Sequence, residues 1–379
     1  MTTSGHSSRP AAGPHDDLGA ARFIPGYFQI GNTVLAGNPL AQSSDGERDQ
    51  VLGLARRALP RVASWAASYP LMGKPEDPHS RTAWACMYYA YAYPGGPVRQ
   101  VADLTCLTLA IFAQDDILDG VVPGFSYERM AELSGGVHGL MDCPPRRIPP
   151  PCDPQLPPDG QVVAAYEDCH RRIAAYQAFA WARPYVARHW RWNQAAMLQE
   201  SRWALGIDPA PALDAYLDNA LASLHMTFIG AVEIAMSSLP TLPDSTLRAY
   251  DQALRLAALA GRLSNDIRTA RREALEAGTN AVCLLMRSGA TEQQAITTLR
   301  SAVTATIDDL DTAVRALPGQ LARHGRRLLR RVRFVCDWYL YADSHGFSLR
   351  QLSADASAVP ANDPPPVHTP APPPAGGPA

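Results

Sequence analysis

The stretch IFAQDDILDG, residues 111–120, places the carboxylates of Asp115, Asp116 and Asp119 directly after an apolar run. An α-helix turns by about 100° per residue, so Asp115 and Asp119 share one face and Asp116 lies beside them. Carboxylates this close repel one another unless a cation lies among them. Hard cations such as Mg²⁺ take oxygen ligands and commonly bridge carboxylates to the phosphates of a substrate. The stretch therefore indicates either a solvated helix end or one half of a metal site.

A second oxygen-rich stretch, RLSNDIRTARRE at residues 262–273, favours the metal site. It carries Asn265, Thr269 and Glu273 at a spacing of four, which stacks the three side chains along one face of a helix. An amide oxygen, a hydroxyl and a carboxylate form an all-oxygen set that suits Mg²⁺ better than zinc or iron. A polar helix surface remains the alternative for this stretch taken alone.

These two stretches resemble the signature motifs of class I terpene synthases. The segment DDILD at 115–119 resembles the aspartate-rich DDxxD motif, and NDIRTARRE at 265–273 matches the ND(L/I/V)x(S/T)xxxE motif at every defined position. Weaker similarities are AYAYPGGP at 90–97 and the E-x-x-W formed by Glu200 and Trp203. The resemblance covers roughly residues 20 to 350. It implies a single-domain, bacterial-type cyclase that uses three Mg²⁺ ions to ionise a prenyl diphosphate.

The resemblance also assigns roles to individual residues. Asp116 and Asp266 are expected to orient ligands or to pair with arginines, and Arg272, beside the final glutamate of the motif, to contact the diphosphate. The residues expected to bind the metal ions are Asp115, Asp119, Asn265, Thr269 and Glu273.

Two features of the family are missing from this chain. The diphosphate-sensing arginine usually lies about 46 residues before the motif's asparagine, where this chain has Asn219 and Ala220. The C-terminal Arg-Tyr pair is replaced by His-Gly-Phe at residues 345–347. Three other arginines could take over the contact with the diphosphate, or could simply form surface contacts and salt bridges: Arg262, Arg268 and Arg333.

Helical spacing identifies candidates for an apolar pocket beneath the motifs. Some lie one or two turns before Asp115 on its face, and the aromatic ones could stabilise a carbocation. Each could instead be an ordinary core residue. The candidates are Thr108, Ile111, Phe112, Phe228, Trp338 and Tyr341. Gly230 is expected either to allow a close backbone approach or to break its helix.

The size of the substrate depends on how much of this pocket is filled. The stretch before the first motif, TLAIFAQ, has one aromatic residue among small and aliphatic ones. A roomy pocket favours geranylgeranyl diphosphate, with farnesyl diphosphate second. Three alternatives remain open: a synthase acting on a pre-cyclised labdane-type diphosphate, a chain-elongating prenyltransferase and a non-catalytic helical binding protein. The similar run IDDLD at 307–311 lacks a strongly apolar lead-in and is expected to be solvated.

Composition narrows the possible partners and locations. The chain has 379 residues, of which 46% are hydrophobic, and a net charge of −2, so nucleic acid is not an expected partner. No apolar run reaches the length of a membrane span, and the N-terminus lacks the pattern of a secretory signal. A cytoplasmic protein is expected, and a homodimer is possible. The arginine-rich run at 323–333 indicates a helix with one charged face.

The remaining pattern predicts an all-α bundle in one domain at residues 21–350. Residues 1–20 and the proline-rich tail at 353–379 are expected to be disordered, and the proline-rich stretch 143–160 to be a loop. The expected helices cover 47–68, 80–92, 97–119, 161–182, 185–204, 211–237, 243–276, 291–315 and 319–343.

Overall fold

The computed structural model describes residues 29–30, 33–34, 40, 43–72, 81–145, 155–275 and 279–341. The predicted N-terminal segment, the C-terminal tail and part of the proline-rich loop lie outside these residues. Nearly all of the described chain is helical, which confirms the all-α prediction. The exceptions include two short antiparallel strands, β1 (Gln29–Ile30) and β2 (Thr33–Val34).

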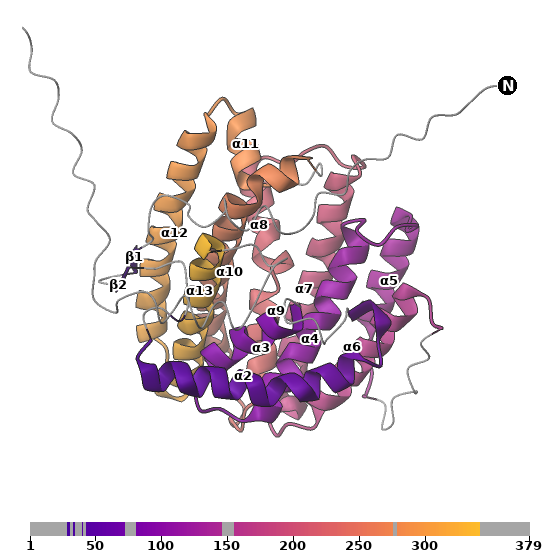
Figure 1. Ribbon diagram of the computed structural model, residues 1–379, viewed down its shortest axis with the longest axis vertical. Helices are drawn as coiled ribbons and strands as arrows, with labels where there is room; N and C mark the ends of the chain where they lie inside the picture. Colours follow the sequence, from indigo (N-terminus) through magenta and orange to yellow (C-terminus); the bar gives the residue numbers. More distant parts are fainter. Residues whose placement is uncertain are drawn as a thin grey trace, which may run out of the picture.

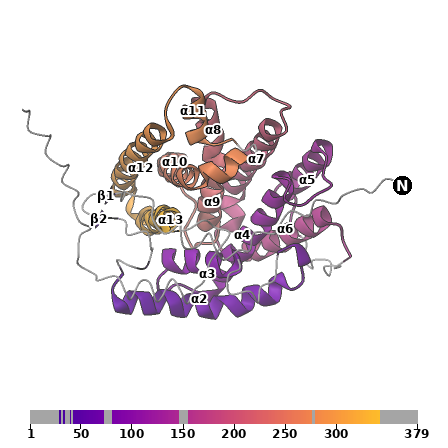
Figure 2. The ribbon, with the colours of Figure 1, turned by 45° about the horizontal axis from the view of Figure 1, so that its top comes forward.

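The α-helices, in chain order, are α2 (Asp45–Ala66), α3 (Arg81–Ala92), α4 (Val98–Leu118), α5 (Tyr127–Gly139), α6 (Pro158–Ala174), α7 (Phe179–Ala204), α8 (Leu213–Ser223), α9 (Met226–Ala235), α10 (Asp244–Leu275), α11 (Ala281–Arg287), α12 (Glu292–Arg315) and α13 (Ala322–Tyr341). The helices α10, α12 and α13 lie on one side of the bundle, α5 and α6 lie on the other, and α2 runs across its lower edge (Figure 1). Figure 2 shows α3 above α2, facing the middle of the bundle. Of the described helices, none is long and apolar enough to cross a membrane.

The predicted break between two helices near Pro184 was wrong. The helix α7 begins at Phe179 and continues through Pro184. Proline is unfavourable inside a helix but does not always end one, and the buried face of α7 continues on both sides of Pro184, with Ala182 and Tyr185 in the core. The break lies earlier, between the end of α6 at Ala174 and the start of α7. At the start of α6, Pro158 is the first helical residue, a position that suits proline, and α6 therefore shortens the predicted loop.

The predicted helix at 211–237 is interrupted, but not at Gly230. The interruption falls at His225, whose φ of 64° places it in the left-handed region, so α8 ends at Ser223 and α9 begins at Met226. Gly230 lies inside α9, and a Cβ there would lie 2.2 Å from Leu254 Cδ2. The close approach predicted for Gly230 is therefore confirmed, and the helix break at this residue was wrong. The sequence pattern also missed the short helices α5 and α11.

The arginine-rich run in α13 has the predicted charged face, but two of its arginines lie on the opposite, buried side. The charged face consists of the exposed Arg323 and Arg326 and the half-buried Arg330 and Arg333. Arg327 is buried, and Arg331 is fully buried and pairs with the equally buried Glu233 of α9 at 3.1 Å. Burial alone would lower the pKa of Arg331, but the carboxylate of Glu233 holds it above its usual range. The buried side of α13 thus carries an ion pair within the bundle, which the sequence pattern did not predict.

Candidate active site

The first motif lies at the C-terminal end of α4. Asp115 and Asp116 are half-buried on its last turn, and Asp119 is the exposed capping residue, whose backbone N–H donates to the Asp115 carbonyl at 2.8 Å. Arg81, at the start of α3, donates from Nη1 to both carboxylate oxygens of Asp116 at 2.9 and 2.7 Å. Asp116 is therefore engaged by an arginine, while Asp115 and Asp119 share the other side of the motif.

The second motif lies along one face of α10, near its C-terminal end. The buried Thr269 hydroxyl donates to the Asn265 carbonyl at 2.9 Å. Glu273 accepts a hydrogen bond from Asn280 Nδ2 at 2.9 Å, and Arg272 lies 3.7 Å from its other oxygen. The Asn265 side chain is half-buried and forms no hydrogen bond to another described residue. Its amide oxygen is therefore available to a ligand.

Arg262, one turn before Asn265, connects α10 to α7 and α8. Its Nη2 donates to Ser223 Oγ at 2.7 Å and to Glu200 Oε1 at 3.1 Å. Burial alone would lower the pKa of Arg262, but Glu200, Tyr216 and other surrounding groups hold it well above its ordinary value. The guanidinium therefore stays charged beside the second motif.

The fully buried Asp266 holds α8, α10 and the start of α11 together. The Tyr216 hydroxyl lies within hydrogen-bonding distance of both carboxylate oxygens, at 3.0 and 2.8 Å, and the Ala281 backbone N–H donates to one of them at 2.9 Å. Burial raises the pKa of Asp266 to about 7. This carboxylate points to structural partners instead of a ligand, as expected from the sequence.

The carboxylates of α4, α7 and α10 act on one another electrostatically. Burial, then Glu200 and Asp116, raise the pKa of Asp115 to about 7. Desolvation by the surrounding chain, then the carboxylates of Asp115, Glu200 and Glu273, raise the pKa of Asp119 well above its ordinary value. Because these pKa shifts arise from carboxylates of all three helices, the two motifs lie close enough to repel one another, and a cation between them would relieve the repulsion.

The donor atoms around this space fit a hard divalent cation. Among the described residues, no group of three or more His, Cys, Asp and Glu side chains is arranged to hold a metal ion. The ligand set predicted from the sequence combines carboxylates of both motifs with the amide and hydroxyl oxygens of α10. Oxygen-only sets of this kind are typical of Mg²⁺ sites that share the ion with substrate phosphates.

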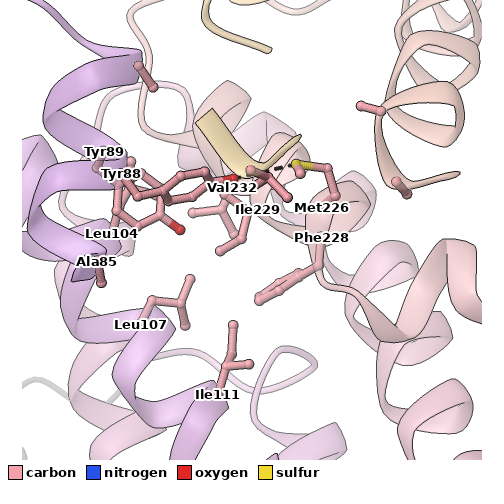
Figure 3. Close-up of a cluster of buried hydrophobic side chains, with 14 of the residues drawn as sticks. Ala85, Tyr88, Tyr89, Leu104, Leu107, Ile111, Met226, Phe228, Ile229 and Val232 are labelled. Atoms are coloured by element: carbon pink, nitrogen blue, oxygen red, sulfur yellow. Dashed lines mark hydrogen bonds between the residues drawn. The ribbon is translucent and has the colours of Figure 1, made fainter. Parts of the chain in front are cut away.

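An apolar region lies beneath the first motif. Side chains from α3, α4 and α9 point toward one another there, and Ile111 and Phe228 approach the centre from opposite sides (Figure 3). Thr108 and Tyr89 share a hydrogen bond of 2.6 Å in this region. The labelled residues are Ala85, Tyr88, Tyr89, Leu104, Leu107, Ile111, Met226, Phe228, Ile229 and Val232.

The other aromatic candidates meet at Trp84 of α3. Its ring centroid lies 5.8 Å from that of Phe112 and 6.4 Å from that of Trp338. The guanidinium of Arg81 lies 5.3 Å from the Phe112 centroid, which connects this cluster to the first motif. The side chain of Tyr341 lies outside the described residues.

Sequence reasoning missed four residues of this site. Arg81 begins a helix without any recognisable motif, and Ser223 and Asn280 lie at helix ends that the pattern did not resolve. Glu200 was noticed as part of E-x-x-W, but no role was given to it. Of the predicted arginines, Arg262 lies within the site, Arg272 lies at Glu273, and Arg268 is half-buried on α10.

Comparisons with known proteins agree with this geometry. Residues 106–309, more than half of the chain, match the family model described as terpene synthase family 2, C-terminal metal binding. A search of curated proteins returns no match.

Similar solved structures include a linalool/nerolidol synthase from Streptomyces clavuligerus in complex with 2-fluorogeranyl diphosphate, which is 18% identical over 75% of this chain and 94% of that chain, with a TM-score of 0.60. A germacradien-4-ol synthase from Streptomyces citricolor is 20% identical over 77% of this chain and 94% of that chain, with a TM-score of 0.58. An α-eudesmol synthase is 18% identical over 81% and 94%, with a TM-score of 0.56. These likenesses show the fold, and the family model shows the relationship: the chain belongs to terpene synthase family 2 and is a class I terpene synthase.

Proposed function

We propose that this enzyme ionises a prenyl diphosphate with the help of Mg²⁺ and cyclises the resulting carbocation to a terpene hydrocarbon or alcohol. The observation that carries the proposal is the pair of oxygen-rich motifs on α4 and α10, of which Glu273 lies near enough to Asp119 to help raise its pKa. Their first ligands, Asp115 and Asn265, are 150 residues apart in the chain, and the apolar region in Figure 3 includes Ile111, one turn before Asp115 on α4. In such a site the motifs would bind the charged head of the substrate, and the apolar region would bind its hydrocarbon chain.

In this proposal the head of the substrate is bound by oxygen ligands and arginines. Mg²⁺ would act as a Lewis acid that neutralises the charge developing on the leaving diphosphate. The residues that would hold it are Asp115, Asp119, Asn265, Thr269 and Glu273. Arg262, Arg268 and Arg272 supply the direct contacts with diphosphate oxygens, which guanidinium groups bind with charge-assisted hydrogen bonds. Arg262 fits this role best because it is charged, held in place by Glu200 and adjacent to Asn265.

The apolar region excludes water from the carbocation, which water would otherwise quench. Aromatic rings lining it can stabilise positive charge through their negative faces. The two best candidates are Phe112 and Phe228, because each ring lies beside a second aromatic ring. Phe112 lies beside Trp84, and the ring centroid of Phe228 lies 4.5 Å from that of Trp190.

Two features act in opposite directions on substrate length. The small and aliphatic residues before Asp115 favour geranylgeranyl diphosphate. The aromatic residues Trp84, Tyr88 and Tyr89 of α3 occupy space next to that stretch, which favours the shorter farnesyl diphosphate. We propose a C15 or C20 linear diphosphate as substrate, and a direct comparison of chain lengths separates the two.

The decisive experiment is incubation with Mg²⁺ and geranyl, farnesyl or geranylgeranyl diphosphate, followed by gas chromatography of a hexane extract. A cyclic product is expected from at least one of them, and elongated diphosphates would indicate a prenyltransferase instead. Asp115→Asn and Asn265→Ala should abolish the product because each removes a metal ligand. Asp309→Asn, an exposed aspartate of the IDDLD run on α12, is the matched control and should retain activity. Unchanged turnover in Asp115→Asn and Asn265→Ala would refute the proposal.

A thermal-shift measurement tests the same site without turnover. Mg²⁺ and inorganic diphosphate together should raise the melting temperature far more than either alone, because each completes the binding site of the other. The synergy should disappear in Asn265→Ala. Its absence in the wild-type protein would contradict the shared metal and diphosphate site.

A further inference from the structure

A cavity outside the candidate active site opens between α2, α4 and α6. It has a volume of about 260 Å³, and arginines from all three helices line it. Asp103, which also lines it, precedes Asp115 by twelve residues on α4. At 1.5 Å per residue this corresponds to roughly 18 Å along the helix axis. The cavity is therefore a separate feature, here called the basic pocket: Arg61, Arg99, Asp103, Cys106, Arg171 and Arg172, with Ala102 and Ala175.

Positive charge exceeds negative charge in the basic pocket. Arg172 bridges two carboxylates, with Nε 2.5 Å from Asp168 and Nη1 3.3 Å from Asp103. Arg171 also pairs with Asp168, and Arg99 lies 3.4 Å from Asp103. These three arginines thus share two carboxylates.

Arg61 adds a further positive charge. It is exposed on α2 and forms no ion pair with any described residue. With Arg61 included, four guanidinium groups face two carboxylates, which leaves an excess of about two positive charges for an anion.

The remaining lining adds no negative charge. Cys106 is buried, and burial raises the pKa of its thiol well above the ordinary value, so that it stays protonated and neutral. The two alanines are small and leave the volume open. The Nε of Arg171 is buried and has no hydrogen-bond partner among the described residues. An unpaired donor of this kind is costly unless a ligand or water satisfies it.

Three of the four arginines, Arg99, Arg171 and Arg172, are held in position before any ligand arrives. The guanidinium of Arg99 lies 4.8 Å from the ring centroid of Tyr176, and the hydroxyl of Tyr176 donates to Asp103 at 2.8 Å. The carboxylate of Asp168 accepts a hydrogen bond from the Trp65 indole at 2.9 Å. A site whose donors are fixed in advance loses less conformational entropy on binding.

We propose that the basic pocket binds a small phosphate-bearing anion of the size of inorganic phosphate or diphosphate. Arginine matches phosphate geometry because its planar fork donates two parallel hydrogen bonds. The cavity is smaller than the pockets that enclose drug-sized organic ligands, which are typically about 300 to 1,000 Å³. The site does not depend on the proposed cyclisation, so an inactive enzyme would leave this inference standing.

Calorimetric titration of the full-length protein with sodium diphosphate and sodium phosphate, in EDTA and without Mg²⁺, tests the inference. Omitting the metal weakens binding at the candidate active site and isolates the basic pocket. The wild-type protein should bind at least one of the two anions. The double variant Arg61→Gln/Arg99→Gln should bind it roughly tenfold or more weakly, since it loses two charge-assisted contacts. Both arginines are exposed, so folding should be unaffected; far-UV circular dichroism checks this.

Two further variants locate the bound anion. Arg56→Gln changes the charge of an exposed arginine on the same helix α2 and should bind like the wild-type protein. Arg262→Met alters the candidate active site and should also leave this binding unchanged. The inference is overturned if the wild-type protein binds neither anion, or if the Arg61→Gln/Arg99→Gln variant binds as tightly as wild type. Loss of binding in Arg262→Met alone would place the anion in the candidate active site and would overturn it equally.

Discussion

Arg262 Nη2 donates to Ser223 Oγ at 2.7 Å and to Glu200 Oε1 at 3.1 Å, so a single guanidinium of α10 joins the ends of α7 and α8. Ser223 is the last residue of α8, directly before the interruption at His225. The arginine therefore lies where the second motif, the interrupted helix and the carboxylate of Glu200 meet. A diphosphate bound there would compete with Glu200 for the guanidinium.

Replacing this arginine by lysine tests whether geometry as well as charge is needed. Arg262→Lys keeps the positive charge but loses the planar fork that contacts two partners at once. We expect kcat to fall by roughly tenfold or more, a loss of at least about 1.4 kcal/mol in transition-state stabilisation. Arg248→Lys, on an exposed position of the same helix, is the control and should retain wild-type kcat. Steady-state kinetics showing equal kcat for both variants would contradict the role of the fork.

Asp116 and Arg81 should matter more for activity than for stability. Their ion pair is partly exposed, with side-chain exposures of 22% and 28%, and such pairs contribute about 0 to 1 kcal/mol to folding. Arg81→Met should therefore change the free energy of unfolding little. It also leaves the charge of Asp116 uncompensated beside Asp115, so we expect kcat/KM to fall by roughly tenfold or more. Urea unfolding and kinetics on the same sample separate the two effects; a variant that loses stability and retains activity would reverse this expectation.

The two motifs could be predicted from sequence because their ligands lie on single helices, where a spacing of four fixes a common face. The ligands of each motif can therefore be grouped without tertiary information: Asp115 with Asp119, and Asn265 with Thr269 and Glu273. Arg81 and Glu200 could not be grouped with them, because their places depend on how α3 and α7 pack against α4 and α10. Contacts between helices are set by the core, and one sequence carries no direct record of them.

The difference between features set within one helix and features set by packing between helices also explains where the fold was predicted wrongly. Pro184 looked like a helix boundary because proline disfavours the helix interior, but the packing of α7 against its neighbours outweighs that preference. His225 carried only a weak signal, because left-handed backbone is uncommon for residues other than glycine even though histidine adopts it more often than most. The buried arginines of α13 were misread since arginine is mostly a surface residue, and only the position of Glu233 on α9 makes burial of Arg331 favourable.

The contact between Gly230 and Leu254 should make α9 intolerant of a side chain at this position. A Cβ at Gly230 would lie 2.2 Å from Leu254 Cδ2, so Gly230→Ala should lower the free energy of unfolding by roughly 1 to 3 kcal/mol. Leu254→Val removes the clashing methyl carbons and should recover part of this loss in the double variant. Gly135→Ala on α5, where a Cβ meets nothing within 4 Å, should be neutral or stabilising. Equal melting temperatures for Gly230→Ala and Gly135→Ala would contradict the close packing.

His225 should make the protein sensitive to acid. Burial, followed by the positive charge of Arg262, lowers the pKa of His225 from 6.5 to about 3. Between these values the unfolded chain binds a proton that the folded chain does not, so stability falls as the pH drops below about 6.5. At pH 5.5 the contribution is on the order of 1 kcal/mol relative to pH 7.5.

Asparagine is the informative replacement, because it accepts left-handed backbone and does not titrate. Urea midpoints at the two pH values should differ less for His225→Asn than for the wild-type protein. Part of the sensitivity should remain, since burial also lowers the pKa of His170 and His324 to about 4. His225→Ala should lose stability at both pH values because it removes the ring that packs beside Met197. An unchanged pH dependence in His225→Asn would show that His225 is not the titrating group.

The Arg331–Glu233 pair should be strongly coupled in a double-mutant cycle. Both side chains are fully buried, and the Tyr93 hydroxyl donates to the second oxygen of Glu233 at 2.7 Å. Removing one partner leaves an uncompensated charge in the core, so Arg331→Met and Glu233→Gln should each lower the free energy of unfolding by roughly 3 to 5 kcal/mol. The double variant leaves no charge behind, and its loss should be well below the sum of the two single losses.

Urea unfolding of all four proteins gives the coupling energy, with Arg326→Met, a nearby exposed arginine of α13, as the control. Additive losses would mean that each charge is compensated by other groups, such as the tyrosines around the pair, and that the ion pair itself does not hold α13 against α9.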